Sequence, residues 1–157
     1  MELYIFGTEH GWVRLPATAE QLPAGVLTVC LVENGDNRFE GIAEKIERSQ
    51  IPELNRMALV LLSLSESERE KLDALLECES NISVRMVAQL LPMLSQTTLL
   101  VGVTNDELLG RYHMEKTLHI TLPRHLAAHF DYQGYGKTVR KSNHGIYTSV
   151  GCLLRRL

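Results

Sequence analysis

Two consecutive helices are predicted between Ile51 and Glu79, and they constrain the fold more than any other part of the chain. Apolar residues recur at helical spacing through the first helix: Leu54, Met57, Ala58, Leu61 and Leu62. Because Leu59 and Val60 fill the gaps between them, we expect little of this helix to face water. Pro52 suits its first turn and marks a boundary with the preceding residues.

The second helix is predicted to begin at a capping box, Ser65-Glu66-Ser67-Glu68, which satisfies free backbone amides. Leu72, Leu75 and Leu76 lie on its apolar side. At about 100° per residue, four acids fall within roughly 60° on the other side. These four acids, here called the acidic ridge, are Glu66, Glu70, Asp73 and Glu77. Such a row is either a solvated face or a working surface, and the pattern alone favours the first.

A similar row of acids is predicted after residue 37. Asn37 would cap a helix with one apolar side, formed by Phe39, Ile42, Ala43 and Ile46. The opposite side would carry Glu40, Glu44 and Glu47.

Strands are predicted on both sides of the central helices, and the fold class is therefore α+β. Before these helices, the β-type runs are 3–6, 11–16 with Trp12 turned inward or at a surface contact, and 26–32. After them, the runs are 98–103, 118–122 and 145–154. Further helices are expected at 18–22, at 84–91, after Thr104 or Asn105, and from Pro123. Pro92 should end or kink the helix at 84–91. Residues 33–36 and 131–136 have the composition of turns.

The charge is distributed unevenly along the chain. The net charge is −3, yet residues 1–80 hold 15 acids against 7 lysines and arginines, while residues 81–157 hold 4 acids against 9. The first half should attract basic surfaces, and the second half could bind nucleic acid. No apolar run is long enough for a membrane span, and the N-terminus lacks the pattern of a secretory signal. Three widely spaced cysteines indicate free thiols in a reducing cytoplasm.

Signals for catalysis or cofactor binding are weak. Gly136-Lys137-Thr138 lacks the earlier glycine of a phosphate-binding loop, because Asp131 stands in that place. His125 and His129 have metal-binding spacing, but no third ligand accompanies them. We therefore expect a non-enzymatic protein with no cofactor and no metal.

Four short segments resemble the ArdA-type antirestriction proteins of plasmids, transposons and phages. They are Gly11-Trp12-Val13-Arg14-Leu15-Pro16, Ile51-Pro52-Glu53-Leu54-Asn55-Arg56-Met57-Ala58, Glu107-Leu108-Leu109-Gly110-Arg111-Tyr112 and Phe130-Asp131-Tyr132-Gln133-Gly134-Tyr135-Gly136-Lys137, the last followed by Gly145 and Tyr147. These segments occur in the family's order across nearly the whole chain.

The resemblance implies an elongated chain of small α/β domains flanking a central helical domain, with divisions 1–50, 51–95 and 96–157. It also implies a homodimeric mimic of DNA that inhibits type I restriction–modification enzymes by presenting carboxylates in place of phosphates. The candidate phosphate-mimicking acids are Glu40, Glu44, Glu47, Glu66, Glu70, Asp73, Glu77, Asp106, Glu107 and Asp131.

The sequence departs from the family pattern in its charge. Gln133 and Thr138 replace acids of the fourth segment, and Arg140 and Lys141 follow. Mimicry should therefore be confined to the first two-thirds of the chain. The alternative is a nucleic-acid-binding or regulatory protein of a mobile element, acting through the basic residues Arg111, Lys116, Arg124, Lys137, Arg140 and Lys141.

Overall fold

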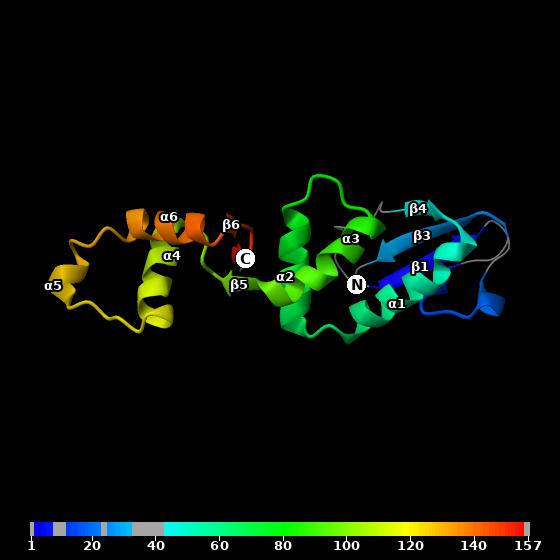
Figure 1. The fold of residues 1–157 in the computed structure, drawn as a ribbon, viewed down its shortest axis with the longest axis horizontal. Helices are drawn as coiled ribbons and strands as arrows, with labels where there is room; N and C mark the ends of the chain where they lie inside the picture. The colour runs from blue at the N-terminus through cyan, green and yellow to red at the C-terminus, as the bar shows by residue number, and fades with distance from the viewer. Residues whose placement is uncertain (1, 8–11, 23–24, 33–42, 156–157) are drawn as a thin grey trace. The chain divides into compact units, whose positions relative to one another are not determined.

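The computed structural model describes residues 2–7, 12–22, 25–32 and 43–155 (Figure 1). Within them the chain is α+β, as predicted, with two antiparallel sheets and six α-helices. The chain divides into two compact units, residues 1–69 with 81–91 and residues 70–80 with 92–157. Each unit is described by itself below, and the division at residues 50 and 95 remains a prediction.

The sheet of the first unit has the strand order β2-β1-β3-β4 and is antiparallel throughout. Its strands are β1 (Glu2–Gly7), β2 (Val13–Arg14), β3 (Leu27–Val32) and β4 (Ala43–Ile46). Alternate residues of the two central strands are buried because successive side chains point to opposite faces. These core residues are Leu3, Ile5, Leu27, Val29 and Leu31.

Strand β4 corrects the prediction of a second acidic helix. Ala43 and Lys45 are exposed, whereas Glu44 and Ile46 are half-buried, which is the alternation of a strand. Pairing with the β-branched β3 outweighs the helical spacing of the isolated sequence. Glu44 therefore lies on a strand, Glu47 lies just after it, and Glu40 and the predicted 33–36 turn lie outside the described residues.

Trp12 is not turned inward. Its side chain is 56% exposed and packs against Phe6, with ring centroids 5.2 Å apart and the ring planes tilted by 42°. The short 3₁₀ turn η1 (Ala19–Gln21) agrees with the helix expected at 18–22.

Helix α1 (Ile51–Ser63) begins with Pro52 in its first turn, as predicted. One side is buried, through Ile51, Leu54, Met57, Ala58 and Leu61. The expectation that little of it faces water is wrong, because the gap-filling residues Leu59 and Val60 are exposed, and so is Leu62.

Asn55 joins α1 to the segment after β2. Its side-chain amide accepts a hydrogen bond from Ala17 N at 3.0 Å and donates one to Ala17 O at 2.8 Å. Leu15, two residues before, is buried, and its backbone N donates to Leu3 O of β1. Asn55 of the second family-like segment therefore binds the residue that follows the first segment.

The capping box of helix α2 (Glu66–Glu77) is formed as predicted. Ser65 N donates to Glu68 Oε2 at 2.9 Å, and Glu68 N donates to Ser65 Oγ at 3.4 Å. Helix α3 (Val84–Leu90) is capped by Ser83, and the 3₁₀ helix η4 (Leu91–Gln96) replaces it around Pro92. This agrees with the expected effect of proline on a helix.

The sheet of the second unit has the order β5-β7-β6, with β5 (Thr97–Val101), β6 (Ile146–Tyr147) and β7 (Gly151–Arg155). The single final strand expected over 145–154 is in fact a hairpin. Its turn is closed by Thr148, whose backbone N and Oγ both donate to Gly151 O.

Helices α4 (Asp106–Tyr112) and α6 (Tyr132–Ser142) pack against each other in this unit. A π-helical turn, η5 (His113–Thr117), continues α4, and a short helix, α5 (Arg124–Ala127), precedes α6. Two predictions are wrong here: 118–122 is not a strand, and 131–136 is mostly helical. Asp131 starts α6 as an N-cap that accepts a hydrogen bond from Gly134 N, which overrides the turn composition.

Two glycines allow α4 and α6 to approach closely. A Cβ at Gly136 would overlap the backbone carbonyl of Asp106, and a Cβ at Gly110 would overlap that of Tyr132. Since the neighbouring atoms belong to the backbone, no side-chain rotation relieves the overlap. Any larger residue must therefore separate the helices.

We expect Gly136→Ala to lower the free energy of unfolding by about 2–3 kcal/mol, because forced separation outweighs the helix propensity gained by alanine. Urea denaturation followed by circular dichroism measures the change. Gln133→Ala, at an exposed position of the same helix, is the control and should change stability by less than about 0.5 kcal/mol. Equal stability of the two variants would contradict a close backbone contact.

Candidate protein-interaction surface

The acidic ridge is only partly a solvent-exposed row. Glu66, Glu70 and Glu77 are exposed on α2, whereas Asp73 is half-buried. Glu66 and Glu70 make no hydrogen bond or ion pair with another described residue, so both carboxylates are available to a partner. Leu72, Ala74, Leu75 and Leu76 are buried, as the amphipathic pattern predicts.

Glu77 already has a structural role. Its carboxylate accepts hydrogen bonds from Ser149 N at 2.8 Å and 3.1 Å and from Ser149 Oγ at 2.8 Å. These bonds tie the end of α2 to the β6–β7 turn. Glu77 therefore keeps its charge at the surface but is less free than Glu66 and Glu70 to adapt to a partner.

The acids of the N-terminal row are also partly engaged. Glu44 is half-buried and accepts a hydrogen bond from Val84 N at 2.8 Å, so it satisfies an amide in the first turn of α3. Glu47 is exposed, and its carboxylate accepts a hydrogen bond from Ser49 Oγ at 3.3 Å.

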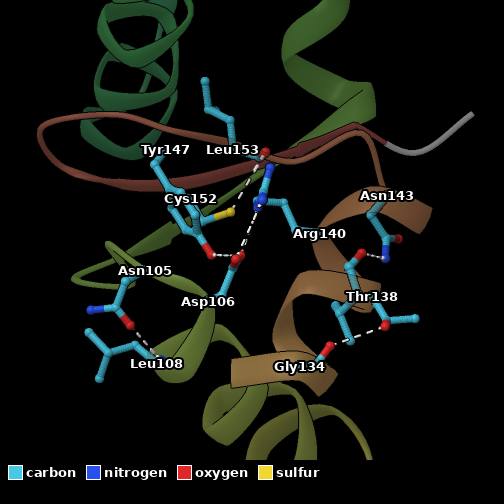
Figure 2. A network of polar contacts seen from close by, with 11 residues as sticks. Asn105, Asp106, Leu108, Gly134, Thr138, Arg140, Asn143, Tyr147, Cys152 and Leu153 are labelled. Carbon is cyan, nitrogen blue, oxygen red and sulfur yellow. Dashed lines mark hydrogen bonds and ion pairs between the residues drawn. The ribbon is translucent and has the colours of Figure 1, made fainter. Parts of the chain in front are cut away.

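Asp106 lies at the centre of a polar network that the sequence pattern did not reveal (Figure 2). Its carboxylate is bound by Arg140 Nε at 2.7 Å and by the Tyr147 hydroxyl at 2.7 Å. The hydrogen bond from Arg140 is the main cause that lowers the pKa of Asp106, and the bond from Tyr147 lowers it further. Burial and the bond to Asp106 raise the pKa of the Tyr147 phenol.

This network links α4, α6 and β6, which are distant in sequence. The Arg140 guanidinium carbon also lies 5.4 Å from the centre of the Tyr147 ring, within the range of a cation–π contact. Asp106 is thus neutralised inside the unit and is poorly placed to imitate a phosphate. No local spacing signals a pair this far apart in the sequence.

The two other candidate acids that follow α2 in the sequence, Glu107 and Asp131, are also engaged. Glu107 is exposed but pairs with Arg111 at 3.0 Å, four residues later on α4. Arg111 in turn lies over the Tyr132 ring, 4.2 Å from its centre. Asp131 is the N-cap of α6.

The residues considered for a phosphate-binding loop and for a metal site do not have the geometry of either site. Gly136, Lys137 and Thr138 lie inside α6 rather than in a phosphate-binding loop. His125 and His129 are exposed, and α5 ends at Ala127, between them. In the described part of the chain, no group of three histidine, cysteine or acidic residues could hold a metal ion. Burial raises the pKa of the Cys152 thiol to about 11.

Over residues 2–7, 12–22, 25–32 and 43–155, no helix combines the length and apolar character required to cross a bilayer.

Comparison of the sequence with protein-family models gives no match, and comparison with curated proteins gives no significant match.

We expect Asp106→Asn to reduce the free energy of unfolding by roughly 1–2 kcal/mol at neutral pH, because asparagine loses the charge that pairs with Arg140. The folded-state pKa of Asp106 lies below its unfolded value. Its contribution is therefore complete above about pH 4 and is lost as pH falls through the folded pKa. The free energies of unfolding of the wild type and of Asp106→Asn should therefore approach each other as the pH falls. Denaturation of both proteins between neutral and acidic pH measures this change.

Asp131→Asn is the matched control for this prediction. Asparagine is as good an N-cap as aspartate, so the stability at neutral pH should change by only a few tenths of a kcal/mol. A stability difference between wild type and Asp106→Asn that stays constant down to low pH would show that the ion pair does not contribute.

Proposed function

We propose that the protein is a non-enzymatic DNA mimic that inhibits type I restriction–modification enzymes through the exposed acids of α2. The observation that carries the proposal is the pair Glu66 and Glu70, exposed and without a partner among the described residues. The sequence resemblance to ArdA-type proteins supports the identity of the target. The proposal therefore has two parts: the acids of α2 imitate DNA phosphates, and the target is a type I restriction–modification enzyme.

The spacing of these acids supports the mimicry. Glu66 and Glu70 are one helical turn apart, about 6 Å along the axis at 1.5 Å per residue. In one strand of duplex DNA, every second phosphate is about 6.8 Å along the axis, at 3.4 Å per phosphate. Glu77, which also stays exposed, extends the row by about 10 Å. A groove that binds DNA phosphates could accept this row in their place.

Acids that already bind a cation or a backbone amide contribute less to the proposed surface. Asp106 and Glu107 are paired with arginines, and Glu44 binds a backbone amide. A carboxylate paired with a cation presents little net field to a basic groove. Of the candidate acids, we therefore assign the main contribution to Glu66 and Glu70, with Glu77 and Glu47 secondary.

Inhibition should be visible in cells. We expect unmodified phage to plate more efficiently on a restricting host that expresses the protein than on the same host without it. Plating of modified phage is the control, since it is insensitive to restriction. Equal plating of unmodified phage with and without the expressed protein would refute the proposed function.

The charge dependence can be tested with purified components. Replacing Glu66 and Glu70 together by glutamine should weaken inhibition roughly 30-fold, if each charge contributes about 1 kcal/mol. Inhibition by the wild type should also weaken with salt, because exposed charges are screened. The inhibition constant of DNA cleavage by a type I enzyme, measured at two ionic strengths, gives both values.

A control variant, Glu20→Gln with Glu115→Gln, changes the net charge by the same amount at exposed positions outside α2. We expect it to inhibit almost as well as the wild type. If both double variants lose inhibition equally, net charge rather than the α2 row is responsible.

The proposal includes a homodimer, as the family resemblance implies. Light scattering on the purified protein should give twice the 17.7 kDa mass of the chain. A monomer at all accessible concentrations would remove this part of the proposal and leave the charge argument intact.

A further inference from the structure

The outer side of α6 carries positive charge without acids. Gln133, Lys137 and Lys141 are exposed and follow one another at four-residue intervals, about 6 Å apart along the helix. No aspartate or glutamate occurs within α6. We call these three residues the α6 stripe.

The charges of the stripe are available, unlike those of the nearby arginines. Arg111 pairs with Glu107, and Arg140 pairs with Asp106, so two of the six cations grouped by the sequence pattern are neutralised. Lys137 and Lys141 form no ion pair or hydrogen bond with another described residue.

The positive charge of Lys137 interacts electrostatically with Asp106 and helps to lower the pKa of that carboxyl. Because Asp106 is bound directly by Arg140, this group of three still has a net charge of one positive unit. The exposed Lys116 and Arg124 add positive charge to the same unit. An anionic polymer is therefore the complementary partner.

The stripe offers contacts to phosphate but none to bases. Proteins that hold single strands stack the bases on exposed aromatic rings. The aromatic residues of α6 are engaged elsewhere: Tyr132 is buried beneath Arg111, and the half-buried Tyr135 hydroxyl lies 2.8 Å from His113 Nδ1. A duplex presents its phosphates outward and requires no stacking.

We propose that the α6 stripe binds the phosphate backbone of duplex DNA, with Lys137 and Lys141 each contacting one phosphate. The Gln133 amide can donate a further hydrogen bond to a phosphate oxygen. The contact is independent of base sequence, because phosphates do not report sequence directly. The α6 stripe shares no residue with the acids of α2 to which we assign inhibition. DNA binding by the stripe and inhibition by the acids can therefore fail independently in experiments.

Fluorescence anisotropy of a labelled duplex, titrated with the full chain at about 50 mM salt, tests the proposal. Two phosphate contacts predict that the logarithm of the association constant falls with the logarithm of salt concentration with a slope of about −1.8. Replacing Lys137 and Lys141 together by glutamine should raise the dissociation constant at least tenfold, flatten the slope by about 1.8 and leave the far-ultraviolet circular dichroism unchanged.

Lys45→Gln with Lys71→Gln is the matched control, since it removes the same charge from the first sheet and from α2. We expect it to bind the duplex as tightly as the wild type, or slightly more weakly. Absence of wild-type binding at low salt would overturn the proposal. So would equal weakening by both double variants, or tighter binding of single-stranded DNA than of duplex.

Discussion

The close backbone contact between α4 and α6 is the constraint on which the second unit depends. Because Gly110 and Gly136 have no side chains, the two helices approach until backbone meets backbone. That approach sets Asp106 beside Arg140, and Tyr147 of the sheet completes the network (Figure 2). It also lets Leu109 and Val139 share one apolar core with Leu100, Val103 and Cys152. A larger residue at either glycine would disturb the core and the network together.

The same network shows that the fold itself uses carboxylates, and an acid used in this way contributes little to the proposed DNA mimicry. An acid imitates a phosphate only while its charge is not compensated, yet the fold uses acids to satisfy amides and cations. Asp106 binds Arg140, Glu44 binds the first turn of α3 and Glu77 holds the β6–β7 turn. Among the candidate acids that the structure describes, Glu66 and Glu70 on the exposed side of α2 escape this use. The number of candidate acids in a sequence therefore overstates the charge that a partner encounters.

Features with local causes could be predicted from the sequence, whereas features caused by distant contacts could not. The Ser65 capping box and the helix break at Pro92 depend on neighbouring residues and agree with the structure. Strand β4 forms because β3 pairs with it, although its own residues have helical spacing. Residues 132–142 are helical despite two glycines, since α4 packs against them. For the candidate surface, the sequence located the α2 acids but not Arg140, the distant partner that neutralises Asp106.

The structure gives the family-like segments a common physical role. Asn55 of the second segment binds Ala17, just beyond the first, while Gly110 of the third contacts Tyr132 of the fourth. These residues make contacts that specify backbone geometry, and none of those contacts requires a surface charge. A chain can therefore retain the segments, and with them the fold, while its exposed charges change independently. The exposed acids of α2 and lysines of α6 lie on helix faces where substitution leaves the core intact, and it is to them, rather than to the segments, that we assign partner binding in both proposals.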